Sequence, residues 1–279
     1  MNVVPEARQM NVVPEARQMN VVPEARQMNV VPEARQMNTA TLIGVGVGPG
    51  DPELVTVKAV RVLREADLVL VPVADTGERG RAEATVLAHV RHDRVRRVVF
   101  ALEASAERAG REAAWDSAAD TVAAAFGTGA SAVAFATIGD PNVYSTFTYL
   151  AATVRDRVPG LTVATVPGIT AMQDLAARSG TVLCEGKETL ALLPLTAGLD
   201  RFTQALATFD TVVGYKSGRH LPEVIAAVRD AGRLGEAVHG AALGLPGEDI
   251  RPAADVTGQA PYLSTLLVPG RRTHRGGKL

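Results

Sequence analysis

The chain has 279 residues, of which 47% are apolar, and a formal net charge of −1. This balance argues against a general nucleic-acid binder, because no excess of Lys or Arg is available to neutralise a polyanion. Cys184 is the only cysteine, which excludes an intramolecular disulfide and a Cys-rich metal site and fits a reducing cytoplasm. No apolar run approaches the ~20 residues that cross a bilayer, so we expect a soluble cytoplasmic protein with no membrane partner.

The first 36 residues are four identical copies of MNVVPEARQ, and a fifth copy breaks off after Asn38. This unit is too short for a solenoid repeat, contains a proline and offers little apolar surface to bury. We therefore expect residues 1–38 to form a flexible tail. The basic segment 271–279 is expected to be a second, solvated tail.

From Thr41 onward, short β-branched runs alternate with longer alanine-rich amphipathic segments, a pattern that predicts an α/β fold built from βαβ units. We expect strands at residues 41–46, 68–72, 97–101, 131–136, 161–166, 189–193, 211–215, 237–243 and 262–268. Thr56 is a good N-cap for the first helix, and residues 104–126 are expected to form a long helix. The length suits two domains, which we place at residues 39–155 and 156–270.

The most informative motif is LIGVGVGPGDPELVTVK at residues 42–58, a glycine-rich turn between a strand and a helix. Its glycines alternate from Gly44 to Gly50, whereas a dinucleotide fingerprint needs them at the first, third and sixth positions. A P-loop is excluded too, since no Gly-Lys-Ser/Thr closes the run and Asp51 puts a negative charge where a phosphate would lie. The motif therefore favours a ligand without phosphates. A turn that binds no ligand is the alternative.

Two further segments repeat the order of strand, turn and helix: TIGDPNVYST at 137–146 and VPGITAM at 166–172. Ligands of open α/β sheets lie at such turns, and Gly139 permits close approach of the backbone to a flat ligand. Asp140 can accept hydrogen bonds from a ligand or cap the following helix, and the sequence leaves both roles open. Thr170 is a candidate N-cap in the last turn. Three turns of this kind favour a shared binding site.

The three segments occur in the order and approximate spacing of the tetrapyrrole methylases, so residues 41–268 resemble that family of S-adenosylmethionine-dependent enzymes. Tyr-Ser-Thr after Gly-Asp-Pro, with CEGKETLALLP, YKSGRHLPEV and PYLSTLLV, looks most like the subgroup that methylates C20 of precorrin-2 in cobalamin biosynthesis. The resemblance implies two α/β domains with a cleft between them. In that cleft a folded S-adenosylmethionine lies below a tetrapyrrole. It also implies a homodimer. We expect no metal, because His89 and His92 lie three apart on an expected helix with no third ligand nearby.

The resemblance assigns methyl-donor contacts to residues of the three turns and to positions further along the chain. They are Pro49, Gly139, Asp140, Val143, Thr170, Ala171, Tyr215, Lys216 and Ala241. Lys216 stands where relatives that act on uroporphyrinogen tend to carry a methionine. It is therefore an equal candidate for binding a carboxylate of the substrate.

A reduced tetrapyrrole carries many carboxylates and needs several cations around one mouth. The candidates are Arg79, Arg81, Lys187 and Arg219, and the arginines suit bidentate binding of a carboxylate. Taken singly, each also fits a solvated surface charge. A proton must leave the methylated carbon, and the candidate catalytic residues for that step are Asp51, Tyr144 and Glu185, with no order among them.

Other activities stay open on the sequence alone. Within the fold they are methylation of cobalt-factor II or of another tetrapyrrole position, as in uroporphyrinogen III enzymes, and methylation of ribosomal RNA or the diphthamide precursor. A non-catalytic effector-binding module is an alternative of a different class. Binding of a free tetrapyrrole separates the first group from enzymes that require ribosomes or elongation factor, and turnover of labelled S-adenosylmethionine excludes the module.

Overall fold

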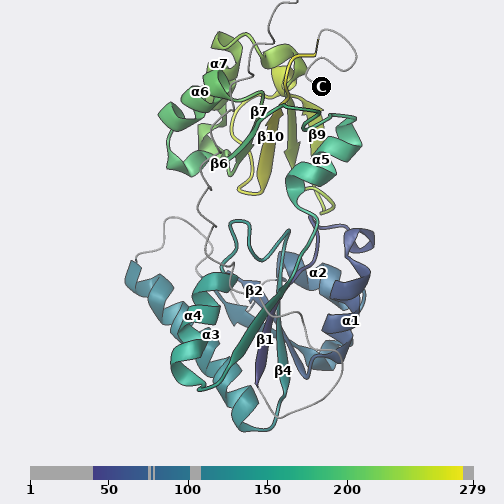
Figure 1. Ribbon diagram of the computed structural model, residues 1–279, viewed down its shortest axis with the longest axis vertical. Coiled ribbons are helices and arrows are strands. Elements are labelled where there is room, and N and C mark those ends of the chain that lie inside the picture. Colours follow the sequence, from purple (N-terminus) through teal and green to yellow (C-terminus); the bar gives the residue numbers. More distant parts are fainter. Residues whose placement is uncertain (1–39, 75–76, 78, 101–107, 273–279) are drawn as a thin grey trace, which may run out of the picture.

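The computed structural model of the chain describes residues 40–74, 77, 79–100 and 108–272, which form two α/β units placed end to end (Figure 1). The expected α/β class and the arrangement in two units are confirmed. The tail expected at 1–38 lies outside the described residues, as do residues 273–279 of the second tail. Among the residues described, no helix combines the length and the apolar character needed to cross a membrane.

The first unit is built on a five-stranded parallel sheet with the order β3-β2-β4-β1-β5. Its strands are β1 (Thr41–Gly46), β2 (Leu68–Val73), β3 (Val95–Val99), β4 (Ala132–Thr137) and β5 (Thr162–Val166). β1 lies between β4 and β5, and all of its residues are buried. A strand that is covered on both faces needs a continuous apolar run rather than an alternating pattern. The sequence of β1 has such a continuous run.

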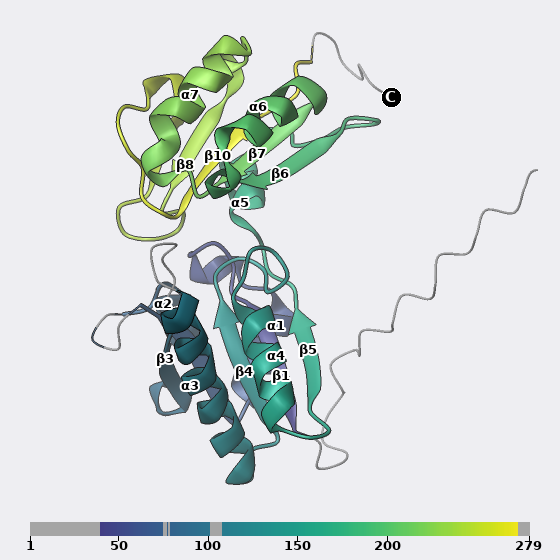
Figure 2. The same cartoon turned by 90° about the vertical axis from the view of Figure 1, so that its left-hand side faces the viewer.

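Helices cover both faces of the first sheet, with α1 and α2 on one face and α3 and α4 on the other (Figures 1 and 2). They are α1 (Val57–Glu65), α2 (Arg81–Leu87), α3 (Arg108–Gly127) and α4 (Phe147–Arg157), with short 3₁₀ helices η1 (Pro52–Leu54) and η2 (His92–Arg94). Thr56 Oγ1 accepts a hydrogen bond from the Ala59 N–H at 3.1 Å, which confirms the expected N-cap of α1. The helix expected at 104–126 is α3, and residues 101–107 lie outside the described part.

The second unit contains a mixed five-stranded sheet with the order β6-β7-β10-β8-β9. Its strands are β6 (Leu190–Pro194), β7 (Thr211–Tyr215), β8 (Val238–Ala241), β9 (Asp249–Pro252) and β10 (Ser264–Val268). β6 and β7 are parallel, whereas β10 runs antiparallel to both β7 and β8. β6 and β7 therefore end at the same edge of the sheet, and β10 begins there.

Helices also cover both faces of the second sheet. α6 (Leu199–Thr208) and α7 (Leu221–Asp230) pack on one face, and α5 (Ala171–Ser179) packs on the other. Four 3₁₀ helices complete the unit: η3 (Leu195–Ala197), η4 (Gly218–His220), η5 (Leu234–Glu236) and η6 (Ala253–Asp255). Since α5 follows β5 directly, the turn between them carries the chain from the first unit to the second (Figure 2).

The domain boundary expected between residues 155 and 156 lies too early in the chain. β5 pairs with β1 in parallel, with Thr162 opposite Thr41, so the first sheet extends to Val166. A proline after a strand indicates where that strand ends. The local sequence of the strand does not indicate which sheet it joins. β9 is also absent from the expected strands, because its half-exposed sequence DIRP at the sheet edge lacks an apolar run.

Candidate active site

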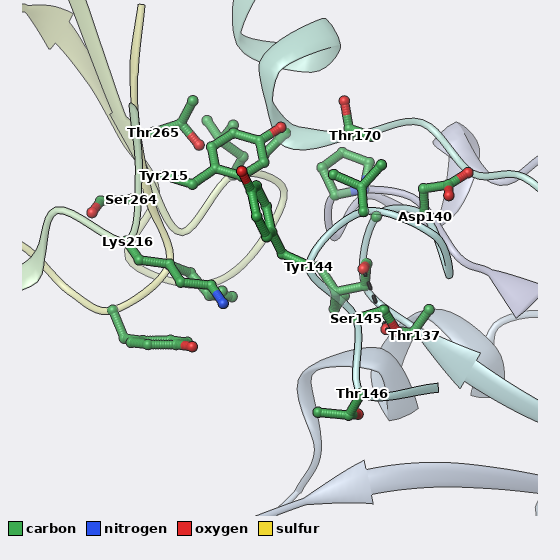
Figure 3. Close-up of a pocket in the computed structure, with 18 residues that line it drawn as sticks. Thr137, Asp140, Tyr144, Ser145, Thr146, Thr170, Tyr215, Lys216, Ser264 and Thr265 are labelled. Atoms are coloured by element: carbon green, nitrogen blue, oxygen red, sulfur yellow. Dashed lines mark hydrogen bonds between the residues drawn. The ribbon is translucent and has the colours of Figure 1, made fainter. Parts of the chain in front are cut away.

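The turns that follow β1, β4 and β5 lie at the carboxyl ends of these parallel strands and face the second unit (Figure 2). This edge is where open α/β sheets bind ligands. A pocket opens here between the two units (Figure 3). Its lining residues are Pro49, Thr137, Ile138, Gly139, Asp140, Val143, Tyr144, Ser145, Thr146, Thr170, Ala171, Tyr215, Lys216, Leu243, Tyr262, Leu263, Ser264 and Thr265. Eight of the nine residues expected to contact a methyl donor are therefore brought together.

The three glycine-containing turns meet through their backbones. A Cβ added at Gly46 would lie 2.5 Å from the carbonyl oxygen of Gly139, and one added at Gly168 would lie closer still to the same atom. The N–H of Gly139 donates to the carbonyl oxygen of Gly48 at 2.7 Å. The glycines of the first turn thus allow close packing of neighbouring turns, which accounts for a spacing that fits no phosphate-binding fingerprint.

Asp140 joins the second turn to the third. Its Oδ1 accepts from the N–H of Asn142 at 2.8 Å, and its Oδ2 accepts from the N–H of Gly168 at 3.0 Å. The following helix begins only at Phe147, so Asp140 does not cap it. The sequence left two roles open for Asp140, capping the helix or binding a ligand. Its observed hydrogen-bond partners are backbone N–H groups, and these bonds fix the shape of the pocket wall.

Gly139 leaves an open place in this wall. Its φ of +71° lies in the left-handed region, and it lines the pocket. The nearest protein atom to an added Cβ would be Thr170 Cα, 4.0 Å away. A side chain at this position would therefore fill space that a ligand can use.

The third turn is held to the second unit by Tyr215, at the end of β7. The phenol oxygen of Tyr215 accepts from the N–H of Met172 at 2.9 Å. Thr170 directly precedes α5 as expected, and both its N–H and its hydroxyl donate to Gln173 Oε1, at 2.9 and 3.0 Å. The first turn of α5 is thus held both by Tyr215 of the second sheet and by the bonds between Thr170 and Gln173.

Strained backbone is concentrated at the pocket. Among the described residues, the non-glycine residues with positive φ are Tyr144 (+49°), Lys216 (+62°) and Ala242 (+49°). Tyr144 and Lys216 line the pocket, and Ala242 precedes the lining residue Leu243. A left-handed non-glycine residue costs about 1–2 kcal/mol, so its presence at three positions around one cavity points to function.

Tyr144 spans the two units. It belongs to the turn after β4, and its hydroxyl donates to the carbonyl oxygen of Leu192 in β6 at 3.1 Å. Its ring meets Tyr215 edge to face, with the ring centroids 6.0 Å apart. Burial raises the pKa of Tyr144, so its phenol stays protonated at neutral pH. The side chain therefore suits a hydrogen-bond donor better than a base.

Three other expected site residues lie outside the pocket lining. Asp51 accepts from the N–H of Glu53 at 2.8 Å and caps η1. Glu185 lies before the amino end of β6, where it forms an ion pair with Arg272 at 3.4 Å, whereas the pocket lies at the carboxyl end of the sheet's parallel strands. Ala241 is buried in β8 beside Ser264, which does line the pocket.

Of the four cations expected to bind substrate, Arg79, Arg81 and Lys187 lie outside the lining. Arg79 and Arg81 are exposed on either side of Gly80: Arg79 precedes α2, and Arg81 is its first residue. Lys187 is exposed in the turn before β6, at the same end as Glu185. Arg219 lies in η4, shortly after Lys216, and its side chain is outside the described part.

The segment with Arg79 and Arg81 is anchored by Glu83 of α2, whose carboxylate is buried. Glu83 accepts from the N–H of Gly80 at 3.0 Å and from Arg97 Nε and Nη2 at 2.9 and 3.0 Å. Burial raises the pKa of Glu83, but the hydrogen bonds from Arg97 and Gly80 and the charges of Arg97 and Arg79 outweigh it and lower the pKa overall.

We expect Glu83→Gln to lower the free energy of unfolding by about 2 kcal/mol at pH 7, because it removes the charge partner of Arg97. The folded-state pKa of Glu83 is lowered, so this stabilisation is fully present above its ordinary pKa of 4.5 and is lost as the pH falls through the folded-state pKa. Urea denaturation at pH 7 and in the acid range measures both effects. The surface variant Glu65→Gln should change stability by less than about 0.5 kcal/mol. A Glu83→Gln deficit of equal size at both pH values would contradict this account.

Sequence reasoning did not assign several lining residues to the site. Four of them are residues 262–265, of which the first two precede β10 and the last two begin it, and Leu243 follows β8. The segment PYLST carried part of the family resemblance and was the available signal for the β10 residues. Within the described residues, no group of three or more His, Cys, Asp or Glu side chains is placed to hold a metal ion.

Comparison with known proteins matches residues 41–255 to the family model of tetrapyrrole (corrin/porphyrin) methylases. The chain is 34% identical over 237 residues to precorrin-2 C(20)-methyltransferase of a Sinorhizobium species, covering 82% of this chain and 95% of that protein. It is 32% identical over 231 residues to cobalt-precorrin-2 C(20)-methyltransferase of Salmonella typhimurium, covering 81% and 95%.

Solved structures share the fold. The uroporphyrin-III C-methyl transferase of Thermus thermophilus, complexed with S-adenyl homocysteine, superimposes with a TM-score of 0.55 at 21% identity. The match covers 82% of this chain and 97% of that one.

Proposed function

This chain belongs to the tetrapyrrole (corrin/porphyrin) methylase family, and on that premise we propose that it transfers a methyl group from S-adenosylmethionine to C20 of precorrin-2. The observation that carries the C20 assignment is the 34% identity to the Sinorhizobium enzyme over 95% of its length. The reaction is a step of cobalamin biosynthesis. The cobalt-bearing substrate is the second candidate, since the Salmonella relative is similar to nearly the same extent.

The pocket fits a donor that carries a sulfonium cation and no phosphate. Among the described side chains, its lining contains a single lysine and no arginine, and Gly139 leaves open space where a Cβ would otherwise stand. Backbone N–H groups of the turns are already used: those of Gly139 and Gly168 donate to protein acceptors. A phosphate would find few donors here. The fold neighbour complexed with S-adenyl homocysteine supports the same ligand class.

We assign donor binding to the lining residues of the three turns and to Tyr215. They are Pro49, Gly139, Asp140, Val143, Thr170, Ala171 and Tyr215. S-adenosylmethionine supplies an activated methyl group, so the residues of the chain need chiefly to align it with the accepting carbon, which is worth about 7–11 kcal/mol. Asp140 fixes the second turn against the third. Tyr144 links the two units through its hydrogen bond to the carbonyl oxygen of Leu192. We assign its protonated phenol to alignment of the donor with the substrate.

On the substrate side, we propose that Arg79, Arg81 and Arg219 contact carboxylates at the rim of the cleft. Arg79 and Arg81 follow the carboxyl end of β2, the sheet edge that faces the second unit, and Arg219 follows the pocket residue Lys216. Lys187 lies at the other end of β6, and we assign it no contact with substrate.

We further propose that the enzyme works as a cytoplasmic homodimer. A candidate contact surface lies over α3 and α4, where Trp115 stacks on the half-exposed Tyr149 with ring centroids 4.6 Å apart. Exposed aromatic side chains of this kind are enriched at protein interfaces. Sedimentation of the wild type and a Tyr149→Ala variant tests this assembly.

The proposed reaction is tested with S-adenosylmethionine that carries an isotope-labelled methyl group. Precorrin-2 and its cobalt-bearing form are incubated with the enzyme in parallel, and carbon NMR locates the label in each product. We expect one labelled methyl group, attached to the C20 meso carbon. A label on a pyrrole-ring carbon, or no tetrapyrrole product from either substrate, would refute the assignment.

A further inference from the structure

Among the described residues that line the pocket, Lys216 is the one cation, and two aromatic rings lie beside it. The Lys216 ammonium lies 5.5 Å from the ring centroid of Tyr144 and 5.7 Å from that of Tyr262. Both distances are within the range of a cation–π interaction. Within the described part of the chain, no carboxylate lies within ion-pair distance of Lys216. The ammonium is thus held in place with its charge left available to a ligand.

The backbone fixes where this ammonium can reach. Lys216 adopts a φ of +62°, and its N–H donates to the carbonyl oxygen of Ser264 at 3.1 Å. The next residue, Ser217, is buried and hydrogen-bonded through its hydroxyl to that of Ser264 at 2.5 Å. Lys216 is therefore anchored to the start of β10, and its side chain lines the pocket.

Tyr144 separates Lys216 from the proposed donor site. Figure 3 shows Lys216 on one side of the Tyr144 ring and Thr170 and Asp140 on the other. A lysine close to the sulfonium of the donor would repel it, because like charges raise the energy of the complex. The ammonium therefore suits an anionic group that lies across Tyr144 from the donor.

We propose that Lys216 binds a carboxylate of the tetrapyrrole substrate, with the rings of Tyr144 and Tyr262 holding the ammonium in position. This inference rests on the proposed function, since it needs a polycarboxylate ligand. The family resemblance left two roles open for Lys216, contact with the donor and contact with a substrate carboxylate. The proposal chooses the second. A tyrosine from the first unit and a lysine and tyrosine from the second then form one substrate contact, so substrate binding also depends on how the units are arranged.

The test uses Lys216→Met, which keeps the length of the side chain and removes its charge, together with Lys216→Arg. The matched control is Lys58→Met on α1, outside the pocket lining. Affinity for uroporphyrin III, a stable tetrapyrrole polycarboxylate, is measured by fluorescence, and affinity for S-adenosylhomocysteine by calorimetry. We expect Lys216→Met to weaken uroporphyrin binding about tenfold, with S-adenosylhomocysteine affinity within about twofold of wild type. Lys216→Arg should restore most of the loss, and Lys58→Met should behave as wild type.

The opposite pattern, loss of S-adenosylhomocysteine affinity with uroporphyrin binding unchanged, would place Lys216 on the carboxylate of the donor and overturn the proposal. Unchanged affinity for both ligands, or no uroporphyrin binding by the wild type, would overturn it as well. Failure of the proposed function is distinguishable, because it appears in the labelled-methyl experiment as a wrong position or no product. The binding difference between wild type and Lys216→Met is measured without turnover.

Discussion

Gly139→Val should lower the affinity for S-adenosylmethionine by about a hundredfold or more while leaving the protein folded. Apart from its chain neighbours, the Cβ of the new residue has no protein atom nearer than 4.0 Å, so the fold leaves room for the side chain and the side chain occupies the pocket. The loss corresponds to about 2.7 kcal/mol or more of binding free energy. Calorimetric titration with S-adenosylhomocysteine measures it, and circular dichroism confirms that the secondary structure is retained.

The left-handed backbone of Gly139 needs its own control, because any L side chain there is strained. Gly160 has a φ of +74°, close to the +71° of Gly139, and a Cβ added to it meets nothing within 4 Å. It lies between α4 and β5, outside the pocket lining. Gly160→Val should share the stability loss of about 1–2 kcal/mol and bind the ligand normally. Equal affinities in the two variants would show that the donor does not lie against Gly139.

The three turns could be predicted from sequence because each is a local pattern. A buried apolar strand, a glycine-containing turn and a helix start lie next to one another in the chain, and parallel strands bring their carboxyl ends to one edge. These local patterns predict that Gly139, Asp140 and Thr170 share one site, and all three line the pocket. The sequence also argued against a phosphate ligand at the first turn, where the structure packs Gly46 against the backbones of Gly139 and Gly168.

What the sequence could not provide depends on contacts between distant residues. Glu185 and Lys187 share a segment with β6, but the structure places them at the amino end of that strand, away from the pocket. Tyr262 reaches the pocket only because β10 lies beside β7 and begins where β7 ends. The positive φ of Lys216 is a tertiary effect as well, since no local signal predicts a lysine in the left-handed region.

Gly168→Ala is expected to have the largest effect on stability of the substitutions considered. Its Cβ would lie 2.8 Å from Gly46 Cα and nearer still to the carbonyl oxygen of Gly139. Both neighbours are backbone atoms: Gly46 ends the buried strand β1, and Gly139 lies in the turn after β4, so neither can rotate away as a side chain would. Overpacking of this kind costs about 3 kcal/mol or more. Chemical denaturation should show this loss, and donor binding should fall with it because all three turns shift.

Gly110→Ala in α3 is the matched control, since a Cβ there meets nothing within 4 Å and the helix favours alanine. It should raise stability by about 0.5–1 kcal/mol. Gly46→Ala should resemble Gly168→Ala, because the two glycines press on the same oxygen of Gly139. The double variant should then lose less than the sum of the single losses, as one displacement of the Gly139 turn relieves both. A cost below about 1 kcal/mol for Gly168→Ala would mean that the turns yield easily, and close packing would no longer account for the glycine spacing.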